Sequence, residues 1–100
     1  MIKHIVFVKI KGAASDEEKL NDLQKLKDAL DNLPSEIPEI KKYETGINIS
    51  DSSTAYDLAL SGDFESAEAL DVYRNHPAHL KVLDLISSIK GRTAVVDYEY

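Results

Sequence analysis

Hydrophobic and polar residues alternate along the first ten positions of the chain, as they do in a β-strand. One face of Ile2–Ile10 is apolar and includes His4, whereas the opposite face carries Ile5 and Phe7 between lysines. The segment is rich in β-branched residues and is predicted to end at Gly12. Because both faces have an apolar centre, Ile5 and Phe7 need a cover that helices on the first face cannot supply.

Three more stretches show the same alternation. Residues 40–49 and 56–61 are predicted to pair as a hairpin across a polar turn, and residues 93–100 form the last strand. Gly46 and Gly62 indicate a bulge or a close backbone approach that curves the sheet.

Helical periodicity occupies the intervening segments. A capping box over residues 15–18 starts the first helix, and its acidic run suits the positive helix end better than a bound cation. The predicted core stripe of this helix stops at Pro34 and consists of Leu20, Leu23, Leu26, Leu30 and Leu33. A second helical region starts at 66–73, breaks before Pro77 and is capped by Gly91. Its predicted stripe after the break is Leu80, Leu83, Ile86 and Ile89.

The resulting order is βαββαβ, the ferredoxin-like arrangement of the α+β class, with a four-stranded antiparallel sheet. The segment 34–38 is too short for a linker, so residues 1–100 are predicted to form a single domain. A domain of 100 residues has little surplus stability, which makes a partner subunit valuable.

Composition removes several classes of function. The chain has no cysteine, which excludes disulfides, thiolate zinc sites and cysteine nucleophiles. Its net charge of −6 disfavours nucleic acid and anionic membranes as partners. The apolar run at residues 5–8 is too short to span a membrane or to serve as a signal peptide, so a cytoplasmic location is expected. No glycine-rich phosphate loop is present, and no cofactor is predicted.

The candidate chemistry rests on three histidines and one tyrosine. His4 is either a hydrogen-bonded core residue or a ligand-facing one, and His79 can meet it across the gap between helix and sheet. His76 is interpreted as a helix N-cap or a surface residue, and Tyr73 as an anchor whose hydroxyl finds a partner. His76 and His79 are weak candidates for a metal site, but no third ligand is defined, so no metal is predicted.

Two carboxylates on the last strand, Asp97 and Glu99, point to one face. They are expected to be solvated or to meet Lys3 and Lys9 across strands, and general acid chemistry is not indicated for them.

Three stretches together resemble the dimeric α/β-barrel family, also called Dabb or stress-responsive A/B barrel. They are Met-Ile-Lys-His-Ile-Val-Phe at 1–7, Tyr-Arg-Asn-His-Pro-Ala-His at 73–79 and Val-Val-Asp-Tyr-Glu at 95–99. The resemblance implies a homodimer whose two sheets face each other and close into a barrel, with the helices outside. That arrangement would cover Ile5 and Phe7 with the partner's sheet.

The family includes a plant polyketide cyclase, and the resemblance carries its two histidines onto His4 and His79 and one of its tyrosines onto Tyr73. An aldol-type closure needs a base and a donor for the developing enolate, which two imidazoles could divide between them. The second tyrosine of that enzyme has no counterpart at 23–30, so the plant substrate is not carried over.

Three functions therefore stand at this point. The first is a small organic ligand bound between sheet and helices near His4 and His79, with cyclase-like or lyase-like acid–base chemistry. The second is a non-enzymatic, stress-related dimer or assembly protein. The third is a cofactor-free relative of monooxygenases, which no residue of the sequence specifically indicates.

Overall fold

The computed structural model describes residues 1–11 and 14–100, so the strand end predicted at Gly12 lies outside the described residues. In chain order the elements are β1 (Ile2–Ile10), α1 (Asp16–Asp31), α2 (Leu33–Glu36), β2 (Lys42–Ile47), β3 (Leu58–Phe64), α3 (Ala67–Asn75), α4 (Pro77–Ser88) and β4 (Gly91–Glu99). The strands form one sheet in the order β2-β3-β1-β4, and every neighbouring pair is antiparallel. The predicted α+β fold with a four-stranded antiparallel sheet is confirmed.

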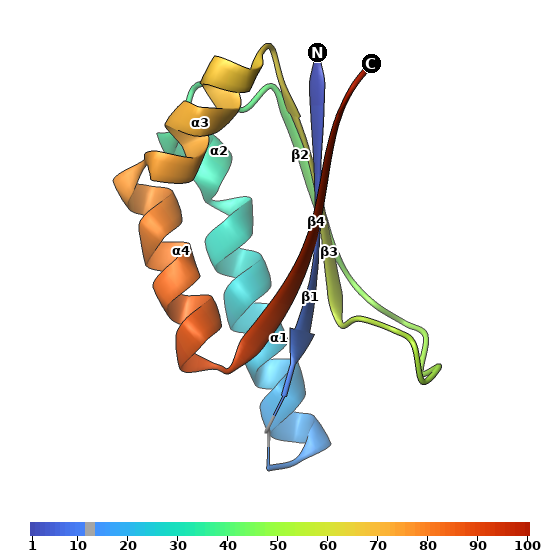
Figure 1. Cartoon of the computed structure of the whole chain (residues 1–100). Coiled ribbons are helices and arrows are strands. Elements are labelled where there is room, and N and C mark those ends of the chain that lie inside the picture. Colours follow the sequence, from blue (N-terminus) through green and yellow to red (C-terminus); the bar gives the residue numbers. More distant parts are fainter. Residues whose placement is uncertain (12–13) are drawn as a thin grey trace.

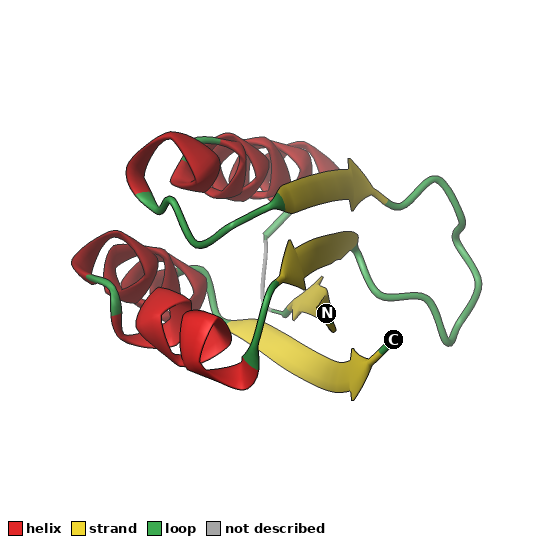
Figure 2. Ribbon diagram, turned by 90° about the horizontal axis from the view of Figure 1, so that it is seen from above, coloured by secondary structure: helices red, strands yellow, loops and turns green. Residues whose placement is uncertain are grey.

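All four helices lie against the same face of the sheet, and the loop between β2 and β3 projects away from them (Figure 1). Seen from above, α1 and α2 cover one half of the sheet and α3 and α4 cover the other (Figure 2). We call the covered side the helix face and the other side the open face. Helices on one side alone leave the open face without a second layer in the subunit.

The helix face carries the core. It includes the inward residues of β1 and β3 together with leucines of α1, and the largest fully buried side chains are Tyr73, Phe64, Leu26, Leu33, Ile37, Leu58 and Val8. Gly62 of β3 makes room for two of the rings that meet there, because a Cβ atom at this position would lie 3.2 Å from both Phe64 and Tyr43. The strand register runs through Gly46 and Gly62 without interruption, so of the two readings of Gly62 the close approach is correct and the bulge is wrong.

The open face retains apolar side chains in contact with solvent. The β1–β4 register places Phe7 beside Ala94 and Ile5 beside Val96. The exposed fractions are 44% for Phe7 and 60% for Val96. The alternation predicted for the first strand is therefore confirmed, and the open face is the apolar surface that the sequence leaves uncovered.

The first helix begins as predicted, since the Ser15 side chain accepts a hydrogen bond from the Glu18 amide at 3.1 Å. It ends earlier than predicted. Pro34 lies in the first turn of α2 and does not stop the helix, a position where proline loses no hydrogen bond. The placement of Leu20 in the core is wrong, because it lies within two turns of the helix start and is 58% exposed.

The core stripe predicted for α4 is also wrong in part. Val82 is buried, whereas Leu80 and Leu83 are exposed. This helix carries apolar residues on two adjacent faces, and packing against the rest of the subunit decides which face turns inward. The helix ends without a glycine cap, because Lys90 adopts the positive φ of 56° and Gly91 begins β4. Gly91 is needed for packing, since a Cβ there would lie 2.7 Å from a side-chain carbon of Ile86.

Candidate functional site

His4 is the buried polar residue of β1 at this site. The β1–β4 register places it directly opposite Asp97, and both side chains lie on the helix face. His4 is 6% exposed, and its Nδ1 lies 2.5 Å from Oδ1 of Asp97. Because a carboxylate only accepts, the Nδ1 atom carries the proton of this hydrogen bond and Nε2 is the nitrogen left for other partners.

The contacts of Asp97 differ from those expected from the sequence. Instead of being solvated or meeting Lys3 and Lys9, it bonds His4 with one oxygen and Arg74 with the other. Lys3 points to the open face, where it pairs with Asp63 at 2.6 Å. The expected lysine partners lie on the other face of the sheet, because the register pairs Asp97 with His4 and not with Lys3. No local pattern could reveal this register, which joins residues 93 positions apart.

The break between α3 and α4 positions the other residues. Ser66 caps α3, accepting from the Ala69 amide at 3.1 Å, and Tyr73 lies on the buried side of this helix. His76 then ends α3 and caps α4, its Nδ1 accepting from the Ala78 amide at 3.0 Å. The predicted N-cap role of His76 is confirmed. The break turns the chain so that His79, one turn into α4, faces the ring of Tyr73.

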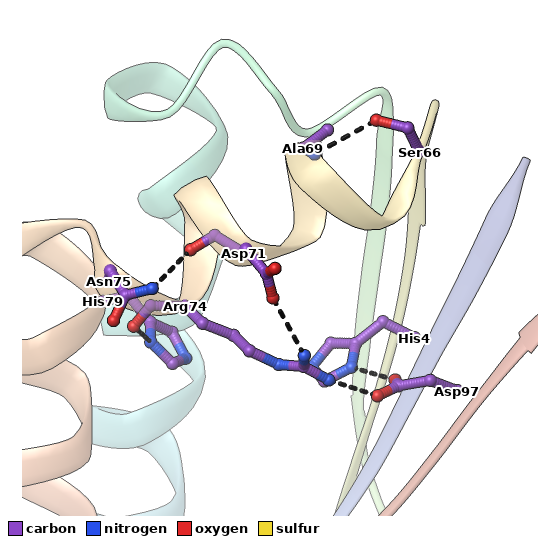
Figure 3. A network of polar contacts seen from close by, with 8 residues as sticks. All are labelled: His4, Ser66, Ala69, Asp71, Arg74, Asn75, His79 and Asp97. Atoms are coloured by element: carbon purple, nitrogen blue, oxygen red, sulfur yellow. Dashed lines mark hydrogen bonds and ion pairs between the residues drawn. The ribbon is translucent and has the colours of Figure 1, made fainter.

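His79 is held by the main chain of the preceding helix. Its Nδ1 donates to the carbonyl oxygen of Arg74 at 3.0 Å, since a carbonyl oxygen can only accept (Figure 3). Burial lowers the pKa of His79, the positive charges of His4 and Arg74 lower it further, and the hydrogen bond to the Arg74 carbonyl opposes the shift. His79 is therefore a neutral imidazole at neutral pH, with the lone pair on Nε2.

Tyr73 separates and supports the two imidazoles. Its ring centre lies 4.4 Å from that of His79 and 5.6 Å from that of His4. Its hydroxyl is bonded to the hydroxyl of Tyr43 on β2 at 2.7 Å. Burial raises the pKa of Tyr73 to about 12, with the Tyr43 hydrogen bond and the charge of Arg74 partly opposing it. Burial likewise raises the pKa of Tyr43.

Tyr43 belongs to this cluster, but the sequence did not identify it as a site residue. It lies within the stretch 40–49, for which the alternation predicts a strand and nothing more. Its distance from Tyr73 along the chain, 30 residues, leaves no local signal for their contact.

A cavity of about 360 Å³ opens between α3, α4 and the β1–β4 edge of the sheet. His4, Tyr73, Arg74 and His79 all line it. The rest of its wall is mostly aliphatic and consists of Val6, Val8, Leu30, Leu60, Val82, Leu83, Ile86, Thr93 and Val95. This volume is within the usual range for small-molecule pockets. The three residues singled out from the sequence thus share one cavity, and we call it the histidine cavity.

His76 does not belong to the histidine cavity. It lines a separate groove between α1, α2 and α4, together with Asn32, Glu36 and Lys81. Within residues 1–11 and 14–100, no group of three or more histidine, aspartate or glutamate side chains is placed to hold a metal ion. The weak metal candidates His76 and His79 therefore open into different hollows.

A larger hollow, of about 520 Å³, lies on the open face at the base of the β2–β3 loop. Phe7, Ile47, Ile49 and Tyr56 are among the residues that line it. Tyr56 is the one titratable group in its wall, so this hollow offers little acid–base chemistry.

The chain belongs to the stress-responsive A/B barrel domain family, whose model matches residues 2–100. A curated relative, an uncharacterized protein of Streptomyces coelicolor, is 33% identical over the full length of both chains. A solved structure of a dimeric protein of unknown function with a ferredoxin-like fold, from Bacteroides fragilis, superposes with a TM-score of 0.88 at 32% identity. The match covers 99% of this chain and 95% of that one.

The hydroxynitrile lyase of Passiflora edulis shares the fold, with a TM-score of 0.76 at 20% identity over 97% of this chain and 90% of that one.

Among the described residues, no helix has the length and apolar character needed to cross a membrane.

Proposed function

We propose that the histidine cavity binds a small, uncharged and largely apolar organic molecule, and that His79 and His4 perform acid–base chemistry on a carbonyl or hydroxyl group of that ligand. The observation that carries this proposal is the presence of both imidazoles in one mostly aliphatic cavity of about 360 Å³. Two titratable groups in different environments, within one apolar pocket, are the usual basis for dividing acid and base roles.

The charges around the cavity favour a neutral ligand. Arg74 is the one lysine or arginine among the described residues of the cavity wall, and it is already paired with Asp97 and with Asp71. A ligand carboxylate would therefore meet a neutralised guanidinium and mostly aliphatic neighbours. A neutral carbonyl compound loses much less hydration on entering such a site than a charged one does.

The two histidines suit different steps. His79 is neutral, so its Nε2 can take a proton from a carbon next to the ligand carbonyl. His4 is oriented by Asp97, and when both of its ring nitrogens carry a proton, its Nε2–H can hold the oxygen on which negative charge develops. The proton on His79 then returns to carbon or to a leaving group. Tyr73, whose hydroxyl bonds Tyr43, serves as a wall that orients both rings.

Exchange of carbon-bound hydrogen for deuterium tests this proposal without a known substrate. Benzylacetone is a neutral aryl ketone of suitable size, and proton NMR in deuterium oxide follows the loss of the hydrogens next to its carbonyl. We expect the wild type to accelerate this loss and His79→Gln to reduce the protein-dependent rate about 100-fold, with a smaller reduction in His4→Gln.

His76→Asn is the matched control, because asparagine also caps helices and His76 lies outside the cavity. It should exchange at the wild-type rate. Equal rates in the wild type and in the variant that lacks both His4 and His79 would contradict the proposal.

We further propose that a second copy of the chain covers the open face, as the resemblance implied. The support is the row of exposed apolar side chains on this face, which includes Phe7, Val96 and Tyr98. The related Bacteroides fragilis protein is dimeric. A twofold axis would bring the same surface of two subunits together and remove these side chains from water. Sedimentation equilibrium tests the dimer, and a monomer at micromolar concentration would contradict it.

A further inference from the structure

Arg74 contacts both halves of the histidine cavity, although it is 43% exposed and is not one of the residues singled out from the sequence. Its carbonyl oxygen accepts the Nδ1 proton of His79, and its guanidinium bonds Oδ2 of Asp97, whose Oδ1 is bonded to His4 (Figure 3). Asp71 holds the guanidinium from the previous turn of α3, at 3.4 Å. A single residue thus reaches one ring through its main chain and the other through its side chain.

We propose that Arg74 is the positioning residue of the histidine cavity: its carbonyl fixes the tautomer of His79, and its guanidinium, by sharing the carboxylate of Asp97, limits how firmly His4 holds a proton. This inference goes beyond the proposed function by naming a residue that controls both rings. The catalytic use of these contacts rests on the proposed function, whereas the contacts and their effect on the two rings are properties of the ligand-free protein.

Asp97 carries the charge that acts most directly on His4. A carboxylate bonded to an imidazole alone favours the imidazolium form, as in any close pair of opposite charges. A guanidinium on the other oxygen offsets the carboxylate charge, so less of that charge acts on the imidazole. His4 can then release its proton more readily, which a proton donor must do once in each reaction cycle.

Few charged groups besides the Arg74 guanidinium lie near His4 and Asp97. Among the described residues, the titratable groups that line its cavity are Tyr73, Arg74 and His79. Asp97 contacts His4 directly, Asp71 bonds Arg74, Tyr43 bonds Tyr73, and Glu99 shares a second hollow with Arg74 and Asp97. The neighbouring β3 positions, Leu60, Gly62 and Phe64, carry no charge. Arg74 is the one lysine or arginine in this set.

The test is an NMR titration of the histidine rings in the ligand-free protein, comparing wild type, Arg74→Gln, Arg74→Lys and Asp97→Asn. In Arg74→Gln the midpoint of the His4 titration should rise by on the order of half a pH unit, because the full charge of Asp97 then acts on the ring. Arg74→Lys should restore the wild-type midpoint in large part. Asp97→Asn should lower it. His79 should keep the proton on Nδ1 in every variant, since each one retains the carbonyl of residue 74.

Lys41→Gln is the matched charge control. Lys41 is an exposed cation whose partner, Glu65, lies 3.7 Å away, so this change removes the same charge away from the cavity. It should leave both titrations unchanged.

An Arg74→Gln protein that is folded and titrates like the wild type would overturn the proposal, as would a rise that Arg74→Lys fails to reverse. If Arg74→Gln does not fold, Asp97→Asn decides, because an unchanged His4 midpoint in that variant contradicts any role of the carboxylate. The titration requires no turnover, so it can succeed even where the deuterium-exchange assay of the proposed function fails.

Discussion

The two faces of the sheet are formed by the same alternating strands but differ in how far their side chains are buried within the subunit. On β1 and β3 the helix face buries its side chains within one subunit, as Phe64 and Val8 illustrate, and it leaves a cavity at its β4 edge. The open face keeps Phe7 and Val96 in contact with water. Apolar residues therefore form the subunit core on the helix face and a candidate interface on the open face. The polar residues among them differ between the two faces. A histidine–aspartate pair lies on the helix face and a lysine–aspartate pair on the open face.

The largest expected effect comes from matched truncations on the two faces. Phe64→Ala should lower the free energy of unfolding by about 3–5 kcal/mol, because Phe64 is fully buried and its removal leaves a cavity in the core. Phe7→Ala, made at the same low protein concentration, should cost well under half of that amount. Urea denaturation followed by circular dichroism measures both. Equal losses would mean that the open face is a core within the subunit, contrary to the comparison.

The second prediction concerns charges placed on the open face. The double variant Phe7→Glu and Val96→Glu should have half the molar mass of the wild type in solution, because two sheets cannot bring four buried carboxylates together. Light scattering after size-exclusion chromatography measures the mass, and an unchanged far-ultraviolet spectrum shows that each subunit remains folded. Unaltered mass would place the interface elsewhere.

The third prediction sharpens the description of the helix face. Tyr43→Phe should cost about 1–3 kcal/mol, since it removes the Tyr43 hydroxyl and leaves that of Tyr73 without its partner, while both rings stay in place. Thermal unfolding monitored by circular dichroism is sufficient for this measurement. A loss several times larger would mean that the pair organises the cavity beyond its own hydrogen bond.

The fourth prediction uses the alkaline limit. The pKa of Tyr73 is raised to about 12 in the folded protein, from its ordinary value of 10.0. The unfolded chain therefore loses this proton first, and stability that is complete below the unfolded value is lost as the pH rises toward about 12. Unfolding experiments at rising pH should show this loss in the wild type and a smaller one in Tyr73→Phe. Identical profiles would show that Tyr73 ionises as it does in the unfolded chain.

The smallest expected effect lies on the acid side. Because the folded-state pKa of His79 is lowered, the unfolded chain binds the proton more readily, and stability decreases as the pH falls below the unfolded value of 6.5. His79→Gln should flatten the dependence of the unfolding midpoint on pH between about 7 and 5. His76→Asn is again the control and should keep the wild-type slope.

The elements could be predicted from the sequence because their signals are local. The capping box at Ser15, the break at Pro77 and the alternation of the first strand each lie within a few residues of the element that they define. The choice of the inward face of α4 was not local. Leu83 and Val82 are equally apolar, and only packing against the rest of the subunit decides that Val82 is buried.

The candidate site was predictable to a similar extent. His4, Tyr73 and His79 could be selected from the sequence, and one cavity holds all three. Asp97, Arg74 and Tyr43 were missed as members of the cluster, because their contacts depend on strand register and on how α3 lies across the sheet. The Tyr43–Tyr73 and Arg74–Asp97 contacts join residues 30 and 23 positions apart, over which no periodicity extends.

The two hollows, one on each face, give the most direct test of the central claim that chemistry belongs to the helix face. Amide and ring signals can be followed by NMR while benzylacetone is added to the wild-type protein. We expect the signals of His4, Tyr73 and His79 to shift together and saturate, and those of Phe7 and Tyr56 to stay in place. Shifts centred on Phe7 and Tyr56, or no saturable shift at the two histidines, would contradict it.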